Sequence, residues 1–392
     1  MQISEVNSPA LVKLFLKVPQ KIHAQILNSQ WIRPLDRDVE MIFNPTQNPC
    51  FQFGECTRWV MQDDRGEPVG RIAAFYDHRI TRKGNKQPTG GIGFFECVHN
   101  YDYARLLFDT AVNWLKTKGM QAADASINFG DRSRWWGVLV RGFELEPTYC
   151  SNYNPPYYAS LFEQYGFQLY FKQYTYQRFV HEAGLAEKFY EKAQRLLKDK
   201  KYKFKHIEIA NLPKYAQDFR TIYNASWVKH LGVSEMTEAE AQAQVRRLKP
   251  IMDERLIWFA YYDDTPIAFF VMIPELNQIV KRLNGKLDWL GKLKFFYYRK
   301  TFKNTKALGL IIGVLPRFQG RGVESAMIAE FSKIAFQSDF PYLELQFNWV
   351  GDFLPAMIRV YEALGAKVCK VHHTYRYLFD REAPFERMPI LK

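Results

Sequence analysis

The residues with the clearest chemical potential lie between Ala307 and Met327, in the stretch ALGLIIGVLPRFQGRGVESAM. An apolar run is followed by a turn that carries Gly320 and Gly322, and then by a helix-forming segment. A strand that passes into a helix through glycines leaves backbone N–H groups unpaired at the positive end of a helix dipole. Because glycine has no Cβ, the oxygens of a pyrophosphate could approach these amides closely. For Gly-Arg-Gly alone, a tight turn without a ligand is the favoured interpretation.

The elements predicted after this turn reverse that preference. A second strand is expected at 342–350, where the sequence reads YLELQFNWV, and a second helix at 354–364, where it reads LPAMIRVYEAL. The order strand, glycine loop, helix, strand, helix within so short a stretch favours an anion-binding loop over an isolated turn.

The segment Val314–Val323, VLPRFQGRGV, resembles the acyl-CoA binding motif of the Gcn5-related N-acetyltransferases. In that motif a strand ends in Pro-x-aromatic-Gln/Arg-Gly-x-Gly and opens a helix. The resemblance implies that the cofactor-binding residues are Gly313, Val314, Gln319, Gly320, Arg321, Gly322 and Val323. Glu324 departs from the family, which has a small residue there, and we expect its carboxylate to weaken phosphate binding or to face away.

The next helix extends the resemblance. Tyr361 and Gly365 match the family's tyrosine, which protonates the departing CoA thiolate, and the glycine that ends the helix. A phenol with a reference pKa of ~10 suits proton delivery to a thiolate. Leu354 replaces the family's asparagine, so that contact with the pantetheine arm is predicted to be lost. Core packing of Tyr361 beside Ile358 is the alternative that the helical spacing leaves open.

The resemblance implies direct transfer of an acyl group to an amine, with acetyl-CoA or another acyl-CoA as the donor. A backbone N–H near Gly313 and Val314 would stabilise the oxyanion. Glu344 is the acidic candidate for a catalytic base, with His372 and His373 expected behind it, although Glu344 could equally be a solvent-facing strand residue. The sequence has no Ser/His/Asp or Cys/His motif that would indicate a covalent intermediate.

The chain of 392 residues, 47% of them hydrophobic, is long enough for two packed cores. The predicted fold class is α+β, with two tandem acyl-CoA N-acyltransferase-like domains, each a mixed, mostly antiparallel sheet flanked by helices. The expected boundaries are a degenerate domain at 1–180, a linker helix at 181–206, and a domain with the acyl-CoA site at 207–392.

The first half lacks a glycine loop. At the corresponding place it has His99-Asn100-Tyr101-Asp102-Tyr103. Asp102 is expected to cap the following helix, and its charge would repel a phosphate. We therefore do not expect the first half to bind CoA.

The formal net charge of +13 is compatible with a nucleic acid, an anionic membrane surface or a polyanion such as CoA, and a solvated basic surface is the simplest explanation. Val280–Lys306 mixes aromatic and basic residues. A connector packed against the sheet is favoured there, and a helix that touches a membrane surface is the second interpretation. DNA binding is not expected.

Five scattered cysteines form no C-x-x-C pair, which predicts reduced thiols and no metal site. No signal peptide and no apolar run of ~18 residues is evident, so a cytoplasmic protein is expected.

The sequence does not choose the acceptor, which is expected to be a small-molecule amine, an amino acid or a peptide. Two other classes stay open. One is a non-catalytic binding module, which Glu324 and Leu354 favour. The other is an aminoacyl transferase resembling the Fem type, whose charged tRNA substrate would suit the net charge but is disfavoured by the CoA-type loop.

Overall fold

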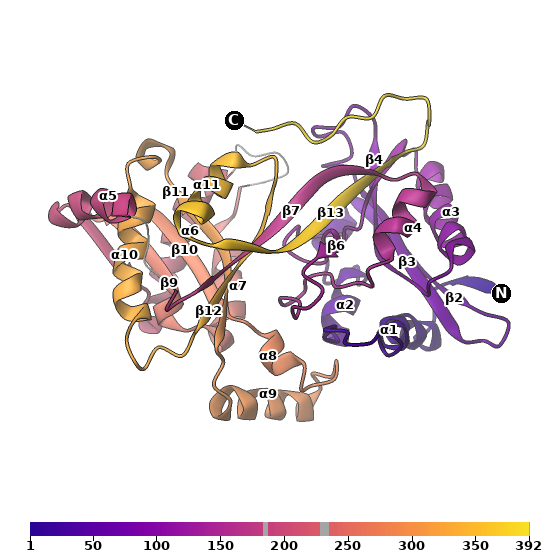
Figure 1. Ribbon diagram of the computed structural model, residues 1–392, viewed down its shortest axis with the longest axis horizontal. Helices are drawn as coiled ribbons and strands as arrows, with labels where there is room; N and C mark the ends of the chain where they lie inside the picture. Colours follow the sequence, from indigo (N-terminus) through magenta and orange to yellow (C-terminus); the bar gives the residue numbers. More distant parts are fainter. Residues whose placement is uncertain (183–186, 228–234, 392) are drawn as a thin grey trace.

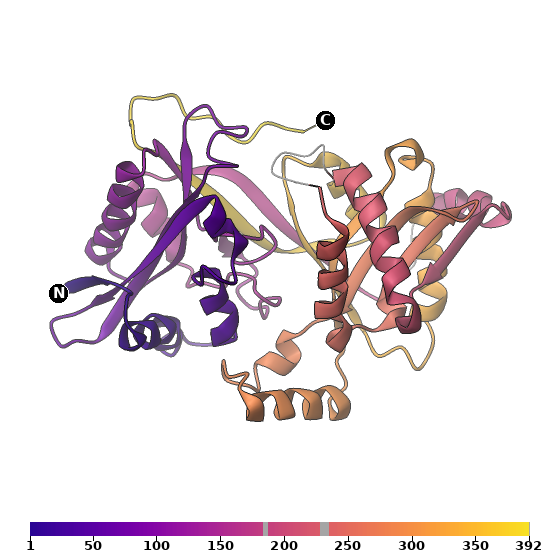
Figure 2. The same cartoon turned by 180° about the vertical axis from the view of Figure 1, so that it is seen from behind.

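The computed structural model describes residues 1–182, 187–227 and 235–391, so residues 183–186 of the expected linker lie outside the described part. The molecule has two halves side by side, joined by strands that run through its centre (Figures 1 and 2). Elements of the first half are β1 (Gln2–Glu5), α1 (Pro9–His23), α2 (Asp36–Ile42), β2 (Gly54–Gln62), β3 (Pro68–Asp77), β4 (Thr89–Cys97), α3 (Tyr101–Thr117), β5 (Ala122–Ala125), β6 (Val138–Arg141), α4 (Tyr158–Tyr165) and β7 (Gln168–Phe179).

The later elements build the second half and return to the first. They are α5 (Glu187–Lys198), β8 (Tyr202–His206), α6 (Leu212–Trp227), α7 (Glu238–Leu248), β9 (Ile257–Tyr262), β10 (Thr265–Pro274), α8 (Asn277–Val280), α9 (Trp289–Thr301), β11 (Lys306–Val314), α10 (Val323–Ala335), β12 (Glu344–Gly351), α11 (Pro355–Ala363) and β13 (Lys367–Leu378). Short 3-10 turns lie at Pro49–Gln52, Ile209–Asn211, Lys249–Ile251, Glu254–Leu256 and Pro316–Phe318.

The strands of the described residues form one sheet. Their order is β1-β2-β3-β4-β5-β13-β7-β12-β11-β10-β9-β8, and β6 pairs with β13. Neighbours are antiparallel except for β4 with β5 and β11 with β12, the two parallel pairs found in the described chain. A mixed, mostly antiparallel sheet flanked by helices confirms the predicted α+β class.

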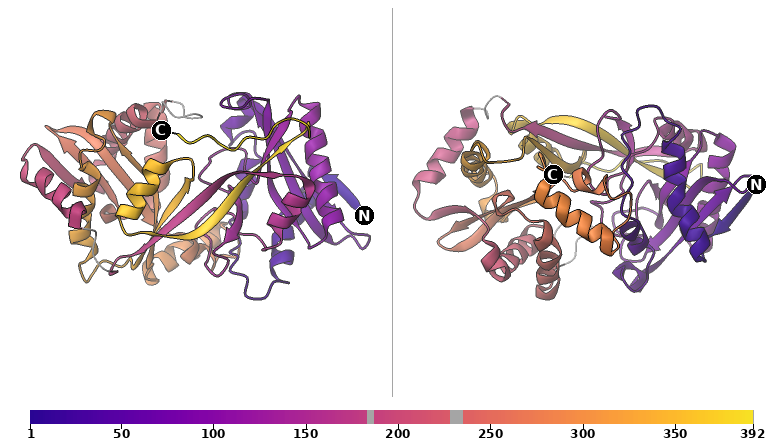
Figure 3. Two further views of the ribbon diagram at one scale, coloured as in Figure 1. Left: turned by 45° about the horizontal axis from the view of Figure 1, so that its top comes forward. Right: turned by 90° about the horizontal axis from the view of Figure 1, so that it is seen from below.

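The two halves exchange strands at the centre of this sheet. The last strand of the chain, β13, pairs with β5 of the first half, with Tyr375 opposite Ala125. In return, β7 pairs with β12 of the second half, with Tyr176 opposite Phe347. The left view of Figure 3 shows β7 and β13 crossing together from one half to the other. Each half is therefore completed by a strand from the other. The domain limits at 180 and 207 stay a prediction.

The expected linker at 181–206 is only partly helical. Helix α5 ends at Lys198, and Tyr202–His206 form the edge strand β8 on β9. In β8 the partly buried Tyr202 and Phe204 alternate with exposed lysines, which is the period of a half-buried strand. The expectation of one long helix was wrong for this part, because the lysine-rich composition concealed the alternation.

Helices cover both faces of each half of the sheet. In the first half, Ile72 and Ala74 of β3 pack towards α3 and α4, while Ala73 and Phe75 face the side of α1 and α2. In the second half, Phe270 of β10 packs towards α10, and its neighbour Phe269 packs towards α6. This strand alternation places α10 and α11 on one face of the second half.

The segment 280–306 corrects the favoured prediction of a connector packed against the sheet. Helix α9 projects from the bottom of the molecule in Figure 1, and Gly291 is its one buried residue. The short helix α8 before it is buried instead, and packs its apolar residues against Ile32 and Leu35 of the first half. The aromatic residues of α9 do not contact the sheet, because α8 occupies the space between the halves.

Candidate functional site

The glycine loop lies between the end of β11 and the start of α10. Gly320 has φ +70° and Gly322, the N-cap of α10, has φ +92°. These left-handed values explain why glycine stands at both positions. A Cβ at Gly320 would meet no atom within 4 Å, so that glycine is required by its backbone conformation and leaves open space above the loop.

The backbone amides of the loop divide into two groups. The N–H of Gln319 donates to the carbonyl of Pro316 at 3.3 Å, and the N–H of Arg321 donates to that of Phe318 at 3.4 Å. By contrast, the amides of Gly320, Gly322 and Val323 have no hydrogen-bond partner in the part of the chain that is described. Three amides thus remain available at the positive end of α10.

Two side chains hold the end of β11 beside this loop. The carbonyl of Val314 accepts a hydrogen bond from Nε2 of Gln319 at 3.0 Å and another from Oγ of Ser226 at 2.9 Å. Gln319 therefore fixes the loop with its side chain. The guanidinium groups of Arg317 and Arg321, both exposed, flank the ring of Phe318 at 5.0 and 5.8 Å.

Beyond the first few residues, β11 and β12 diverge. Their pairing runs from Lys306 opposite Glu344 to Gly309 opposite Phe347, and stops there. The N–H of Leu315 donates to the carbonyl oxygen of Ile267 on β10. Since N–H groups alternate in direction along a strand, the N–H of Val314 points away from β10, towards the gap, whereas that of Gly313 faces β10.

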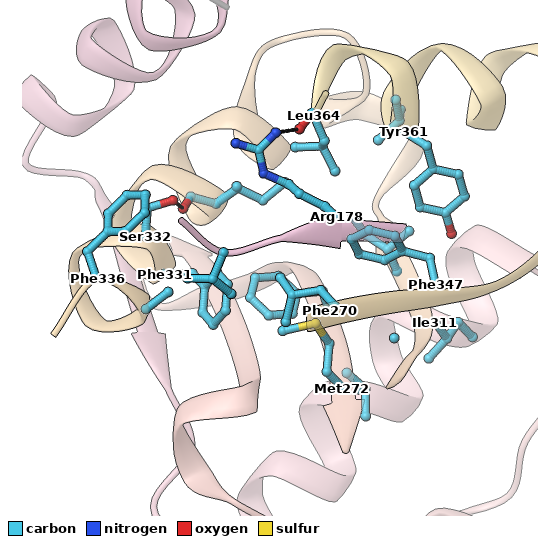
Figure 4. A pocket seen from close by; sticks show the side chains of 18 residues that line it. Arg178, Phe270, Met272, Ile311, Phe331, Ser332, Phe336, Phe347, Tyr361 and Leu364 are labelled. Atoms are coloured by element: carbon cyan, nitrogen blue, oxygen red, sulfur yellow. Dashed lines mark hydrogen bonds between the residues drawn. The ribbon is translucent and has the colours of Figure 1, made fainter. Parts of the chain in front are cut away.

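An apolar pocket lies where the strands diverge, between α10 and α11 (Figure 4). Its volume is about 860 Å³ when the open mouth is included. Gly309 and Ile312 of β11, Phe331 and Ala335 of α10 and Phe347 of β12 are among the lining residues. Of the described residues that line it, one is charged. That residue is Arg178, and its guanidinium donates to the carbonyl of Leu364 and to that of Glu182 rather than into the pocket. The interior therefore suits a hydrocarbon ligand.

Tyr361 forms part of the pocket wall from α11 (Figure 4). The centroid of its ring lies 5.0 Å from that of Phe347 and 5.1 Å from that of Tyr176. The ring thus packs against two aromatic neighbours while it also lines the pocket, so the structure is compatible with a packing role and with a catalytic role. No described residue hydrogen-bonds its hydroxyl group. Desolvation by burial raises the pKa of Tyr361 above its usual value, which keeps the phenol protonated and able to donate at neutral pH.

The structure does not bring Glu344 and Tyr361 together. Leu345 and Phe347 line the pocket, so Glu344 points to the opposite face of β12. There it pairs with Nζ of Lys306 at 3.1 Å and accepts a hydrogen bond from Gln346. Glu344 is 9% exposed and is thus neither solvent-facing nor in the pocket.

His372 and His373 do not lie behind Glu344, as the sequence suggested. They stand on the part of β13 that crosses into the first half, where His372 lies opposite Gln173 and Leu139. Nε2 of His372 is 3.0 Å from the carbonyl oxygen of Asn152. The strand exchange, which a reading of the chain in order cannot reveal, moves both histidines away.

Sequence reasoning missed a buried polar network on this opposite face. Glu275 follows β10 directly and accepts hydrogen bonds from the amides of Tyr149 and Asn277, both at 2.9 Å. Burial raises the pKa of Glu275 to about 7. Nearby, the buried Lys370 donates to Gln346 at 3.1 Å. No motif marks these residues, because the network assembles from both halves of the chain.

The lining of the pocket was also missed, although a signal was present. On α10, Ile328, Phe331, Ser332 and Ala335 recur with the i, i+3, i+4, i+7 spacing of one helix face. That pattern marks the face that turns to the interior, and it does not tell whether another side chain or a ligand fills the space.

The first half lacks a glycine at the start of α3, and its own pocket, of about 690 Å³ with the open mouth included, is lined in part by the polar residues Glu96, Asn152 and Asn154. Asn100, rather than the expected Asp102, caps α3: its Oδ1 accepts from the N–H of Tyr103 at 3.2 Å. Asp102 instead lies in the first turn of the helix. The prediction named the wrong cap because Asn100 and Asp102, two residues apart, are both suitable N-cap residue types, and the cap is the one directly before the first helical residue.

No cluster of three or more potential metal-ligating His, Cys, Asp or Glu side chains occurs in residues 1–182, 187–227 and 235–391. Among the helices of these same residues, none is long and apolar enough to cross a membrane.

No protein-family model matches the sequence. Two relatives match along nearly their whole length. A protein of Caulobacter vibrioides named bacterial ceramide synthase is 26% identical over 383 residues, which cover 96% of this chain and 97% of the relative. Protein YghO of Escherichia coli K12 is 26% identical over 374 residues, with 93% and 92% covered.

Solved structures agree with the fold over the full chain. A tandem GNAT protein of the clavulanic acid biosynthesis pathway has a TM-score of 0.56 at 12% identity, with 98% of this chain and 99% of that chain covered. The same TM-score and identity relate 96% of this chain to 38% of a fungal β-N-acetylglucosaminidase that has a GCN5-related glucosamine N-acetyltransferase region. The chain therefore has the tandem-domain fold of the Gcn5-related N-acetyltransferase superfamily.

Proposed function

We propose that this protein is an acyl-CoA-dependent N-acyltransferase whose donor carries a long hydrocarbon chain. The observation that carries the proposal is the apolar pocket at the divergence of β11 and β12, adjoining a glycine loop with unpaired amides. The relative from Caulobacter vibrioides is named a ceramide synthase, and a ceramide is the amide of a long-chain amine and a fatty acid. This name supports a fatty acyl donor and a lipid-like amine as the acceptor.

The loop residues fit the diphosphate of CoA. The amides of Gly320, Gly322 and Val323 would donate to phosphate oxygens, and Arg317 and Arg321 would add positive charge from the solvent side. CoA itself supplies the thioester that activates the acyl group.

The pocket lies at a suitable distance from this loop for the acyl chain. Its β11 residues stand two to five positions before Val314, which is roughly 7 to 17 Å along a strand. Each methylene buried there would contribute about 0.8 kcal/mol. An acetyl group would leave most of the pocket unused, so the proposal replaces the expected acetyl donor with a longer one.

The residues of the site account for the proton transfers. As the amine nitrogen bonds to the thioester carbon, the N–H of Val314 would stabilise the carbonyl oxygen. As the C–S bond breaks, Tyr361 would give its proton to the thiolate sulfur, and its phenolate would recover a proton from the newly acylated ammonium. This exchange balances without a separate base, and it leaves Glu344 with a structural role in the buried network.

A chain-length comparison tests the proposal. We expect thiol release from palmitoyl-CoA with a long-chain amine, and at least a tenfold lower kcat/KM with acetyl-CoA. Ala335→Trp should fill the pocket and remove most of this preference while CoA binding persists. Ala363→Trp, at an exposed position of α11, is the matched control. If no acyl-CoA of any length binds in calorimetry, the proposal fails.

The role of Tyr361 is tested separately. Tyr361→Phe should lower kcat by about 100-fold, with little change in acyl-CoA binding, because it removes the proton donor and keeps the ring. Tyr176→Phe is the control, since this ring touches Tyr361 but lies outside the pocket lining. An unchanged kcat would exclude Tyr361 as the acid, and binding without any turnover would indicate a non-catalytic binding module.

A further inference from the structure

Helix α9 presents a row of large apolar side chains to the solvent. The exposed fractions are 69% for Trp289, 49% for Leu290, 59% for Leu293, 54% for Phe296 and 63% for Tyr297. Apolar residues are common on protein surfaces as single side chains, but five on one helix form a patch that marks an interaction site.

These five residues share one side of the helix. At about 100° per residue, they fall within an arc of about 120°. The opposite side carries Gly291, Phe295 and Tyr298, and it faces α8 and the first half. Helix α9 thus has two apolar sides, and only one of them is covered. The view from below in Figure 3 shows α9 along its length on the outer surface.

Basic residues border the uncovered side. On the same angular scale, Lys292 and Arg299 lie along one edge and Lys294 lies along the other, while Lys300 lies within the arc in the last turn of the helix. The guanidinium of Arg299 also donates to the carbonyl of Pro250. Residues 286–303 contain six basic residues and a single acidic one, Asp288. The carboxylate of Asp288 caps the helix by accepting from the N–H of Gly291 at 2.8 Å, so it does not offset the basic edges.

The position of α9 is fixed relative to the first half through α8. Side chains of α8 connect to the first half: Nδ2 of Asn277 donates to the carbonyl of Pro147 at 2.8 Å. Directly after α8, Nζ of Lys281 pairs with Glu146 at 2.8 Å. Arg282 lies over the rings of Tyr298 and Phe302 at 5.5 and 4.5 Å and holds α9 against this base. The apolar row is therefore presented in one direction by a rigid support.

We propose that α9 docks in the plane of an anionic lipid bilayer, with Trp289, Leu293 and Phe296 in the interface and the basic edges at the phosphate groups. An uncovered apolar arc between two basic edges is the pattern of an interfacial helix. A second copy of the chain is a poorer occupant, because a two-fold contact through α9 would place the basic edges of both copies against each other.

The proposal does not rest on the acyltransfer reaction, and its test uses vesicles without acyl-CoA or amine. Co-sedimentation with phosphatidylcholine vesicles is compared with that on vesicles containing an equal share of phosphatidylglycerol. We expect at least tenfold tighter partitioning onto the anionic vesicles, and weaker binding at 0.5 M than at 0.1 M salt. The double variant Leu293→Ser, Phe296→Ser should lose at least tenfold in partitioning, because it removes two inserted side chains.

The control variant is Leu27→Ser, Ile390→Ser, which removes two exposed apolar side chains outside α9 and should bind vesicles as the wild type does. Thermal melting of each variant checks that it is folded. Lys292→Glu with Lys294→Glu should reduce binding to anionic vesicles only. Equal binding of all variants, or no preference for anionic vesicles, would overturn the proposal. So would a wild-type dimer in sedimentation equilibrium that the double variant on α9 converts to a monomer.

Discussion

Between α3 and α4 of the first half, the rings of Phe95, Phe108, Phe162 and Phe167 pack against one another with centroids 4.5 to 5.3 Å apart. Between α10 and α11 of the second half, the corresponding space is the apolar pocket. Both halves have a strand, a helix, a parallel strand and a helix in this order, and in the first half the short strand β6 is inserted before α4. The volume of a few side chains, rather than the fold, therefore decides how much space remains between these helices and the sheet. The first half keeps a pocket of about 690 Å³ with its open mouth included, lined in part by Phe162, Glu96 and Asn154.

The ends of the second helices allow a residue-by-residue match. Gly166 after α4 and Gly365 after α11 both have positive φ and end their helices. The amide that follows each glycine donates back to a helical carbonyl at 3.0 Å, to that of Phe162 in the first half and to that of Tyr361 in the second. Phe162 is thus the counterpart of Tyr361, so the first half lacks a phenol at this position.

The two parallel strand pairs, β4 with β5 and β11 with β12, differ in how far their contact extends. In the first half the contact continues past the last paired residues, since the N–H of Ile127 donates to the carbonyl of Ile92 at 2.8 Å. A Cβ on Gly93 would lie 1.8 Å from the carbonyl oxygen of Ile127. At the end of the strand, the N–H of Cys97, which is the last residue of β4 as Val314 is of β11, donates to the hydroxyl oxygen of Tyr158 at 2.9 Å.

The largest expected effect on stability comes from removing one ring of the aromatic cluster in the first half. Phe162→Ala should lower the free energy of unfolding by about 3 to 5 kcal/mol, because it leaves a cavity in a close-packed aromatic cluster. Phe331→Ala, in the second half, should cost about half as much, since one side of Phe331 already faces the pocket. Urea denaturation measures both values. Equal losses would show that the pocket wall is as tightly packed as the first-half core.

The next effect concerns the glycine loop. Gly322→Val should weaken CoA binding by about 100-fold or more, because a β-branched residue resists the left-handed conformation that directs the amides outwards. Gly119→Val is the matched control: its φ is +77°, nothing crowds a Cβ there, and it lies outside the loop. Calorimetric titration with CoA provides the measurement. If both variants bind CoA as the wild type does, the anion site is elsewhere.

Sequence reasoning reached the class of fold and the glycine loop because both depend on local patterns. The turn around Gly320 and Gly322 needs positive φ values, and the flanking strand and helix show their periods within a few residues.

The remaining features depend on contacts between distant parts of the chain. The exchange of β7 and β13, which relocates His372, is decided by pairing across about 200 residues. Whether the space beside Phe331 is empty or filled depends on residues of five other elements, β7, β10, β11, β12 and α11. The spacing of apolar residues on a helix predicts which side chains point inwards. It does not predict whether the space beside them is filled, because that depends on residues far away in the sequence.

A smaller effect links the two halves through pH. Burial lowers the pKa of His372 to about 4, well below its value of about 6.5 in an unfolded chain. The unfolded state therefore binds more protons below pH 6.5, so stability falls as the pH drops from 6.5 towards 4. Between pH 7 and 5 this residue should account for a loss of about 2 kcal/mol.

His372→Gln should flatten that part of the stability profile in urea titrations at a series of pH values. Because β13 connects β5 and β7, near-UV and far-UV signals should report one common transition. A profile that is as steep in the variant as in the wild type would mean that other groups carry the acid sensitivity. Two separate transitions would instead show that the halves unfold independently despite the exchanged strands.

The smallest effect concerns the starts of the two compared helices. Asn100→Ala removes the side chain that caps α3 and should lower the free energy of unfolding by about 1 kcal/mol, with CoA binding unchanged. The corresponding position before α10 is Gly322, which has no side chain that could accept a hydrogen bond from the first amides of the helix. A bound ligand could accept these hydrogen bonds instead. If CoA occupies them, saturating ligand should raise the melting temperature of the wild type and of Asn100→Ala by the same amount. A ligand-induced shift that disappears in Asn100→Ala would place the anion at the first helix and invert the comparison of the halves.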